Sequence, residues 1–194
     1  MDAHFLRACS SEAEFPPPDL PEVAVAGRSN CGKSSLINAV TGRTALARAS
    51  STPGRTQQIV FFQVTLPDAP PFVLVDLPGY GYARASREAQ RRWIALAESY
   101  VGKRACLALL LVLVDIRREP GESEQGLLRW AAERQVSPLV VLTKADKLGK
   151  SQRLTAAEHV RQTLALKRRP LIVSTRDPDS VVELRRTLAS LLPP

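Results

Sequence analysis

The segment Gly27–Ser35 has the residue types and spacing of a phosphate-binding loop. It reads Gly-Arg-Ser-Asn-Cys-Gly-Lys-Ser-Ser, which matches the pattern Gly-x-x-x-x-Gly-Lys-Ser/Thr. Gly27 and Gly32 allow the backbone to curl, so that successive N–H groups can point inward and bind an anion. Lys33 supplies a cation for the β- and γ-phosphates of a nucleotide, and Ser34 offers a hydroxyl to Mg²⁺. The sequence therefore predicts a site for a nucleoside phosphate with Mg²⁺.

A second polar segment, Thr143-Lys144-Ala145-Asp146, follows an apolar run of strand length. The Asp146 carboxylate can accept hydrogen bonds from both N1–H and the exocyclic amine of guanine. Adenine presents an acceptor at N1 and no 2-amino group, so the same carboxylate disfavours it. The aliphatic stem of Lys144 can pack along the purine plane. We therefore expect a guanine nucleotide. A charged loop without a ligand is the alternative.

Two further segments could contact Mg²⁺ and the γ-phosphate. Asp76 opens the sequence Asp-Leu-Pro-Gly directly after an apolar run, where a carboxylate can hold Mg²⁺ through water. Gly79 lets a backbone N–H approach the γ-phosphate. In the long polar stretch 43–58, a threonine hydroxyl could complete the Mg²⁺ shell only while a γ-phosphate is bound, which would make this loop a switch. Thr56 and Thr52 are both candidates, and their chemistry alone does not separate them.

Composition sets limits on the class of protein. The chain has 194 residues, of which 44% are hydrophobic, and no apolar run approaches the length of a membrane span. The N-terminus lacks the basic-then-apolar build of a signal peptide, and the three cysteines share no metal-binding or pairing pattern. We therefore expect a cytoplasmic protein. The net charge of +8 favours an acidic partner such as nucleic acid, although a solvated basic surface would give the same composition.

Apolar runs of strand length alternate with helical periodicity along the chain. Helices are expected after the phosphate-binding loop and at 87–101, 122–134, 151–166 and 180–192; strands are expected at 22–26, 59–64, 72–75, 107–114, 139–142 and 171–173. The short turn at 67–70 makes its two flanking strands antiparallel. This pattern predicts an α/β fold with a mainly parallel six-stranded sheet, one antiparallel strand and helices on both faces. Residues 1–20, which include Phe15-Pro16-Pro17-Pro18, are expected to be a flexible lead-in.

Together, these motifs resemble those of the EngB family of bacterial GTPases, in the TrmE-Era-EngA-EngB-septin-like class. Besides the phosphate-binding loop, the matching segments are Thr52–Gln57, Asp76–Ala83, Asp115–Arg117 and Thr143–Leu148. The resemblance implies a P-loop NTPase fold of the Ras-like G-domain type over residues 21–194. It also implies GTP hydrolysis, action late in assembly of the large ribosomal subunit, and a need for the protein in normal cell division and septation. The implied partners are GTP or GDP and the rRNA and proteins of the large-subunit precursor, bound by a monomer.

The resemblance also assigns roles to residues. It favours Thr56 as the switch threonine, implies Ser34, Thr56 and Asp76 as Mg²⁺ ligands, and implies Lys33, Thr56 and Asn30 as catalytic residues. The implied nucleotide-binding set is Gly27, Arg28, Ser29, Asn30, Cys31, Gly32, Lys33, Ser34, Ser35, Gly54, Arg55, Thr56, Gln57, Gln58, Asp76, Leu77, Pro78, Gly79, Thr143, Lys144, Ala145, Asp146, Val173, Ser174 and Thr175.

Some positions depart from the patterns of related enzymes. Tyr80 stands where Ras-like GTPases carry the glutamine that orients the attacking water, so we expect slow intrinsic hydrolysis. In related GTPases an asparagine at the position of Asn30 helps to bind K⁺ beside the phosphates; here Asn30 could do this or merely shape the loop. Cys31 replaces a small aliphatic residue. Val173-Ser174-Thr175 replaces Phe-Ser-Ser, and Ser174 and Thr175 could close the base pocket through backbone N–H groups.

The sequence is also compatible with two other functions. Tyr80 also fits a nucleotide-gated binding module in which hydrolysis is incidental. A septin-like scaffold acting directly at division is a third reading, but the sequence has no amphipathic basic membrane helix and no coiled-coil extension. Arg84, Arg87, Arg91 and Arg92, and the run Lys167–Arg169, could contact rRNA or simply be solvated.

Overall fold

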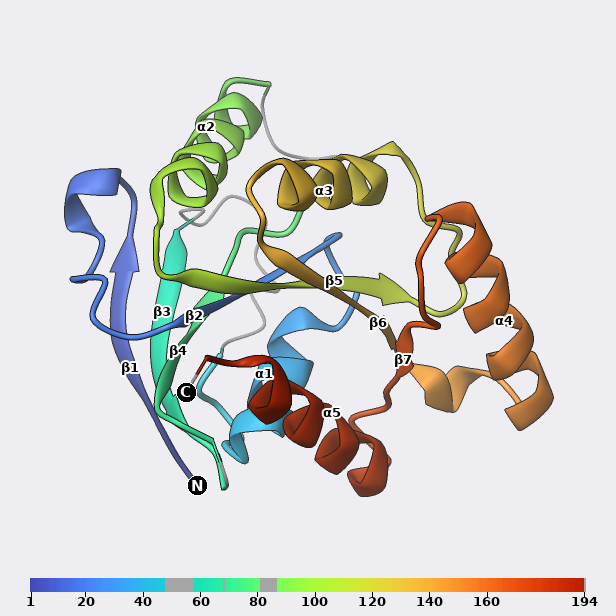
Figure 1. The fold of residues 1–194 in the computed structure, drawn as a ribbon. Coiled ribbons are helices and arrows are strands. Elements are labelled where there is room, and N and C mark those ends of the chain that lie inside the picture. Colours follow the sequence, from blue (N-terminus) through green and yellow to red (C-terminus); the bar gives the residue numbers. More distant parts are fainter. Residues whose placement is uncertain (48–57, 68, 81–86, 194) are drawn as a thin grey trace.

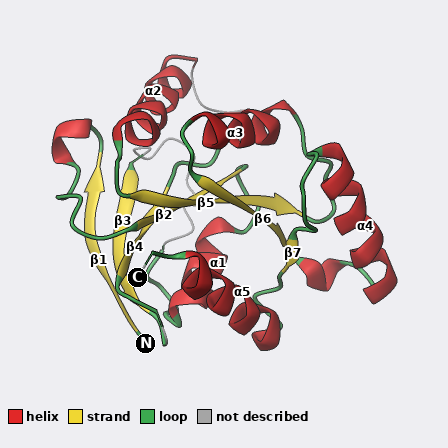
Figure 2. Cartoon of the chain, viewed as in Figure 1, coloured by secondary structure: helices red, strands yellow, loops and turns green. Residues whose placement is uncertain are grey.

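The computed structural model describes residues 1–47, 58–67, 69–80 and 87–193 and has a seven-stranded sheet (Figures 1 and 2). The spatial order is β1-β3-β4-β2-β5-β6-β7. Strands β2, β4, β5, β6 and β7 run parallel, and at one edge β3 runs antiparallel to both of its neighbours, β4 and β1. The strands are β1 (Asp2–Cys9), β2 (Glu22–Gly27), β3 (Ile59–Thr65), β4 (Phe72–Asp76), β5 (Leu107–Asp115), β6 (Ser137–Thr143) and β7 (Leu171–Ile172). The predicted α/β fold with a mainly parallel sheet is confirmed, with seven strands instead of six.

The additional strand lies in the segment that we expected to be a flexible lead-in, so that expectation was wrong for residues 2–9. Strand β1 pairs with β3 along its whole length and covers what would otherwise be the sheet edge. A β-bulge between Phe5 and Arg7 breaks the alternation of buried and exposed side chains, which removes the usual sequence signal of a strand. Phe15 is also held in place, because its ring packs 5.6 Å from that of Phe61 and 5.7 Å from that of Tyr100.

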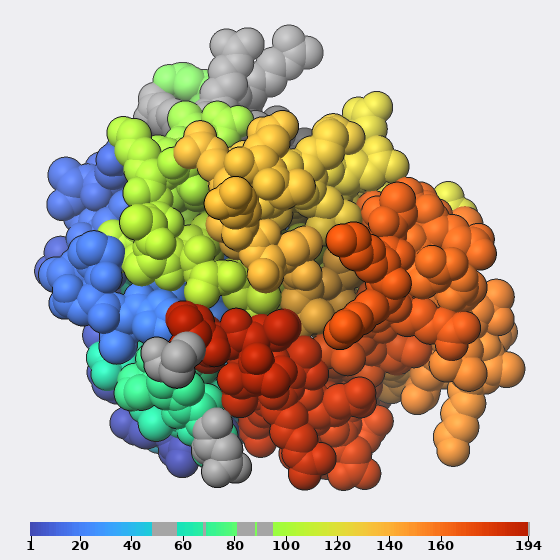
Figure 3. Space-filling model, in the orientation of Figure 1, coloured from blue at the N-terminus to red at the C-terminus, as the bar shows by residue number. Residues whose placement is uncertain are grey.

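Helices cover both faces of the sheet (Figure 1). The helices α1 (Lys33–Thr41) and α5 (Pro178–Leu191) contribute buried side chains to the core on one face. The opposite core receives side chains from α2 (Arg87–Lys103), α3 (Glu122–Glu133) and α4 (Lys150–Thr163). Two short 3-10 helices, η1 (Glu12–Glu14) and η2 (Ala145–Lys147), complete the described elements. In the space-filling view, helices α2 to α5 form most of the visible surface (Figure 3).

The register of the parallel strands brings the predicted functional segments to one edge of the sheet. Gly27 pairs with Leu113 across β2 and β5, and Asp115 pairs with Thr143 across β5 and β6. The carboxyl ends of β2, β4, β5 and β6 therefore finish close together, as ligand sites in this fold class require.

The opposite end of β2 is fixed by a buried charged cluster. Glu22 is 1% exposed, and its carboxylate accepts hydrogen bonds from the hydroxyl of Tyr100 at 2.7 Å and from Nη2 of Arg104 at 2.7 Å. A buried carboxylate needs such partners to offset the cost of leaving water. This cluster therefore anchors α2 to the sheet at the end away from the predicted site.

Candidate nucleotide-binding site

The loop between β2 and α1 has the backbone that its glycines predict. Gly32 has a φ of 99°, in the left-handed region that favours glycine, and Asn30 has a φ of 65°. Gly27 is required for a different reason. A Cβ atom at this position would lie 2.6 Å from Sγ of Cys31 and 3.1 Å from Leu113. Any side chain at 27 would therefore push the loop away from the end of β5.

Helix α1 begins at Lys33, so its N-terminus faces the space enclosed by the loop. Gly32 is the N-cap residue and has no side chain that could occupy the first N–H groups of the helix. These groups have no partner within the helix, and the helix dipole adds positive potential there. Ser34 lies in the first turn and is half-buried. This end of α1 is therefore suited to bind a phosphate group.

The phosphate-binding loop is joined to the segment that follows β4. Tyr80 accepts a 2.8 Å backbone hydrogen bond from the N–H of Ser29 and donates a 3.2 Å bond to the carbonyl of Gly27. A Cβ at Gly79 would lie 3.3 Å from Cα and N of Ser29, so glycine permits this close approach. The Asp-x-x-Gly motif and the loop therefore form one connected wall of the site.

Lys33 and Asp76 face each other inside this wall and form an ion pair, with each side chain 14% exposed. The arrangement suits Mg²⁺, because the Asp76 carboxylate and the Ser34 hydroxyl are the hard oxygen ligands that this ion prefers. Among the described residues, no group of three or more His, Cys, Asp or Glu side chains could hold a metal ion. The third predicted ligand, Thr56, lies outside the described residues.

The Thr143–Asp146 segment is hydrogen-bonded to the backbone of the same loop. The hydroxyl of Thr143 donates a 2.5 Å hydrogen bond to the carbonyl of Cys31, and Nζ of Lys144 donates one to the carbonyl of Asn30, also at 2.5 Å. Lys144 adopts a left-handed backbone conformation with a φ of 59°. Its ammonium also lies 3.1 Å from Oδ2 of Asp115. The predicted base and phosphate segments are thus physically linked.

Asp146 is exposed and is oriented by Ser174, whose hydroxyl donates a 2.8 Å hydrogen bond to Oδ1. This bond is the main reason that the pKa of Asp146 lies below its ordinary value. The N–H of Ser174 itself donates to Oγ of Ser180 at 3.1 Å. The expectation that the N–H of Ser174 contacts the base was therefore wrong, because Ser180 takes that N–H and it is the Ser174 hydroxyl that contacts Asp146. The corresponding expectation for the N–H of Thr175 stays a prediction.

Most of the predicted site residues fall into three groups. Residues of the loop 27–35, Asp76, Gly79, Lys144, Asp146 and Ser174 meet at the same edge of the sheet. Leu77 and Val173 are buried core residues, and Gln58 donates a 3.1 Å hydrogen bond to Ser10 beside β1, so these three are held by other parts of the fold. Gly54, Arg55, Thr56 and Gln57, as well as the alternative switch residue Thr52, lie outside the described residues.

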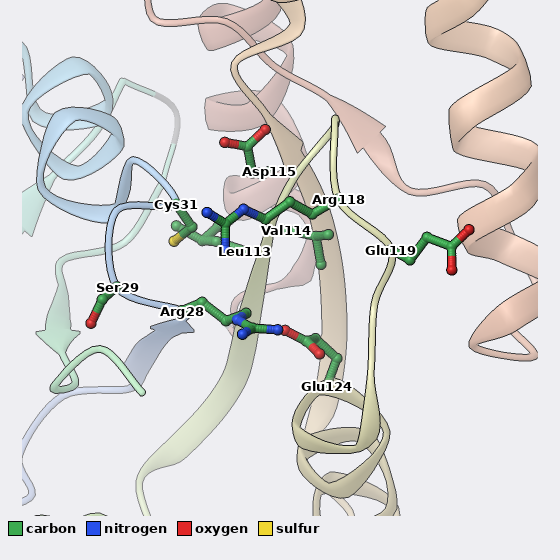
Figure 4. A pocket seen from close by; sticks show the side chains of 9 residues that line it. All are labelled: Arg28, Ser29, Cys31, Leu113, Val114, Asp115, Arg118, Glu119 and Glu124. Carbon is green, nitrogen blue, oxygen red and sulfur yellow. The ribbon is translucent and has the colours of Figure 1, made fainter. Parts of the chain in front are cut away.

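Sequence reasoning left Asp115 and Glu124 without a role, although both are buried carboxylates at this edge. Glu124 accepts a 2.9 Å hydrogen bond from the hydroxyl of Tyr80 and a 2.7 Å bond from the N–H of Gly121 at the start of α3. Figure 4 shows the Arg28 guanidinium pointing toward the Glu124 carboxylate. Burial, with Glu124 as a second cause, raises the pKa of Tyr80 far above its ordinary value, so the phenol stays protonated. The position of Glu124 three residues after Gly121 indicates a helix start. The sequence contains no signal that pairs Glu124 with Tyr80.

A family model described as "50S ribosome-binding GTPase" matches residues 22–144. A probable GTP-binding protein EngB from Syntrophomonas wolfei is 45% identical over 92% of this chain and 91% of its own length. Another from Geobacter metallireducens is 47% identical over 86% of this chain and 79% of its own length. The family model ends at residue 144 and therefore does not include Asp146 or the Ser174 segment. The alignments with the relatives are longer and cover most of the chain.

Solved structures of similar fold include a crystal structure of a probable GTP-binding protein EngB. It has a TM-score of 0.69 at 19% identity and covers 88% of this chain and 97% of its own. A structure of Era in complex with MgGDPNP and nucleotides of 16S ribosomal RNA has a TM-score of 0.74 at 20% identity, covering 90% of this chain and 57% of its own. At these identities the likeness concerns the fold alone.

Proposed function

Because the chain belongs to the EngB family of GTP-binding proteins and is a GTPase, we propose that it acts as a nucleotide switch late in assembly of the large ribosomal subunit. We further propose that it works in the cytoplasm and that normal cell division and septation depend on it. The match to a family of 50S ribosome-binding GTPases carries this proposal. A net charge of +8 supports an rRNA partner, since phosphate contacts supply much of the affinity of such proteins. None of the described helices is long and apolar enough to cross a membrane.

In the proposed site, the N-terminus of α1 and Lys33 bind the β- and γ-phosphates. Asp146, held by Ser174, pairs with the guanine base, and the stem of Lys144 lies along it. Ser34 and Asp76 would hold Mg²⁺, an ion that GTPases of this class generally use, and Thr56 would be a further ligand in the GTP-bound state. The Lys33–Asp76 ion pair supports this assignment. When a magnesium nucleotide binds, its phosphates would replace Asp76 as the partner of Lys33, and Mg²⁺ would replace Lys33 as the partner of Asp76.

We propose slow intrinsic hydrolysis, because the Tyr80 hydroxyl is bonded to Glu124 and is therefore not free to orient a water molecule. Asn30 could compensate by binding K⁺ beside the phosphates. Its side chain is exposed, while its carbonyl accepts the Lys144 bond. Turnover of GTP should be faster in KCl than in NaCl, and Asn30→Ala should abolish the difference. Equal rates in the two salts for the unaltered protein would rule out a role for K⁺.

Co-sedimentation with isolated ribosomal subunits tests the switch directly. The protein should sediment with large-subunit precursors in the presence of a non-hydrolysable GTP analogue and remain in the supernatant with GDP. Lys33→Ala provides the control, because it removes the phosphate-binding cation and should abolish the difference between nucleotides. Identical sedimentation of the unaltered protein in both nucleotides would contradict a switch.

The Tyr80–Glu124 bond also favours a second candidate, a nucleotide-gated binding module in which turnover is incidental. Both functions require GTP for partner binding, but only the first requires hydrolysis for release. Release from the subunit should therefore be compared after loading with GTP and with the non-hydrolysable analogue. Equal release rates would favour the binding module.

A further inference from the structure

Asp115, the last residue of β5, is a buried carboxylate at the predicted base-binding end of the site. It is 4% exposed. Its Oδ2 lies 2.7 Å from Nη2 of Arg117 and 3.1 Å from Nζ of Lys144, and its Oδ1 accepts a 2.9 Å bond from Nε of Arg117. One carboxylate thus pairs with two cations that belong to different segments.

Hydrogen bonds from Arg117 and Lys144 keep Asp115 ionised in this position. Burial by itself would raise the pKa of Asp115, but hydrogen bonds from Arg117 and Lys144 outweigh it and hold the pKa well below its usual range. The Arg117 side chain is 47% exposed and reaches solvent, whereas that of Lys144 is 30% exposed and turns inward. The contact with Lys144 is therefore the one that Asp115 makes toward the interior of the site.

The same lysine spans from the base segment to the phosphate-binding loop. Its Nζ donates to the Asn30 carbonyl, and its Cε lies 3.6 Å from the position that a Cβ at Gly32 would take. Lys144 also has a left-handed backbone conformation, which a residue other than glycine adopts only when its surroundings impose it. A long, flexible side chain is thus held extended by a partner at its ammonium.

We propose that Asp115 is a positioning residue for guanine-nucleotide binding: it holds the Lys144 ammonium against the Asn30 carbonyl, so that the lysine stem is already aligned where the purine stacks. This inference rests on the proposed site, in which Lys144 and Asp146 bind the base. Without Asp115, the ammonium would have to be ordered when the nucleotide binds, and that ordering would lower the affinity. The effect falls equally on GDP and GTP, because the base does not change during hydrolysis.

A double-mutant cycle tests whether Asp115 acts through Lys144. Asp115→Asn keeps the size of the side chain and removes its charge, and Lys144→Met keeps most of the apolar stem and removes the ammonium. We expect each single variant to weaken binding of fluorescent mant-GDP and a mant-labelled non-hydrolysable GTP analogue by roughly tenfold, the size of a lost charge-assisted hydrogen bond. In the Lys144→Met background, Asp115→Asn should cause no further loss. Equal losses from Asp115→Asn in both backgrounds would show that Asp115 does not act through Lys144 and would overturn the proposal.

Further measurements separate positioning from a general loss of structure. A positioning role predicts that Asp115→Asn raises the KM for GTP with little effect on kcat, whereas partial unfolding would lower kcat and the melting temperature. Glu158→Gln is the matched control, because it removes a carboxylate on α4 that pairs with two arginines, Arg161 and Arg169. Its nucleotide affinity should equal that of the unaltered protein. If Asp115→Asn does not fold, Lys144→Met decides alone. Unchanged nucleotide affinity in that variant would show that the ammonium does not contribute to binding and would overturn the proposal.

Asp146→Asn distinguishes failure of this inference from failure of the proposed site. An amide in place of the carboxylate should move the preference from guanine toward xanthine nucleotides. If that preference does not change, the proposed base site is wrong. If it changes while the cycle between Asp115 and Lys144 shows no coupling, only the positioning role is wrong.

Discussion

The hydroxyl of Tyr80 donates a 2.9 Å hydrogen bond to Oε1 of Glu124, and this bond joins the segment after β4 to the first turn of α3. Glu124 is 2% exposed, so its carboxylate depends on this phenol and on the N–H of Gly121 for hydrogen bonds. Tyr80 is also joined to the phosphate-binding loop through its backbone. The residue that follows Asp-x-x-Gly is therefore a structural junction between the loop, β4 and α3.

Tyr80→Phe should destabilise the protein without slowing its intrinsic GTP hydrolysis. Loss of the hydroxyl removes one hydrogen bond from a buried carboxylate, which costs about 1–3 kcal/mol of unfolding free energy. Hydrolysis in the absence of ribosomal subunits should stay within about twofold, because the phenol is directed at Glu124 and not at the reacting water. Urea denaturation and single-turnover hydrolysis measure the two effects.

Tyr100→Phe is the matched control for that substitution. The hydroxyl of the buried Tyr100 is likewise bonded to a buried glutamate, Glu22, but at the opposite end of β2. Tyr100→Phe should cause a similar loss of stability. A large drop in kcat with Tyr80→Phe, absent from Tyr100→Phe, would mean that the Tyr80 phenol takes part in hydrolysis.

Asp76→Asn should make nucleotide binding nearly insensitive to magnesium. The substitution replaces the carboxylate by an uncharged amide of the same size, so Mg²⁺ loses its anionic protein ligand at this position. For the unaltered protein, EDTA should weaken GTP binding by roughly tenfold or more, and for the variant the ratio of the two affinities should fall close to one. Asp179→Asn, an exposed carboxylate in the first turn of α5, should leave the ratio as it is. Retention of the full ratio by Asp76→Asn would remove Asp76 from the magnesium site.

Ser174→Ala should shift the acid limit of GDP binding to higher pH. The Ser174 hydroxyl stabilises the ionised form of Asp146 and is the main cause of its lowered pKa. Without this bond the pKa of Asp146 rises toward its ordinary value of 3.8, so protonation begins at a higher pH and guanine binding is lost earlier as the pH falls. Equilibrium titrations with mant-GDP between pH 7 and the onset of acid unfolding locate this limit. Ser190→Ala on α5 serves as the control, and coincident acid limits for the two variants would contradict the role of Ser174.

The thiols of the folded protein should react slowly with DTNB at pH 8. Burial raises the pKa of Cys9 to about 11, and burial together with Glu22 raises that of Cys106 to about 11. Burial also raises the pKa of Cys31 in the phosphate-binding loop. The thiolate is the reactive form, so the labelling rate should rise about tenfold per pH unit above pH 8 and become fast at once in guanidinium chloride. A rapidly labelled thiol in the native protein would show that one of these sites opens on the timescale of the reaction.

Much of this molecule could be predicted from residue types and spacing, because each feature depends on local chemistry. The glycines and Lys33 in Gly27–Ser35 indicate an anion-binding loop wherever a strand precedes them and a helix follows. The apolar runs at 107–114 and 139–142 are long and uninterrupted, which is typical of strands covered on both faces. Such patterns also determine which edge of a parallel sheet carries the site, since the segments at 27–35, 76–79 and 143–146 each follow a strand.

Only the tertiary structure showed which residues support those motifs. The roles of Asp115 and Glu124 depend on contacts with Lys144 and Tyr80, residues 29 and 44 positions away, and no local pattern specifies such pairs. Strand β1 was missed for a related reason: its bulge disrupts the local alternation, and its stability comes from pairing with β3 fifty or more residues later. A sequence records the chemistry of each side chain, but the partner of a buried charge is chosen by the packing that brings distant segments together.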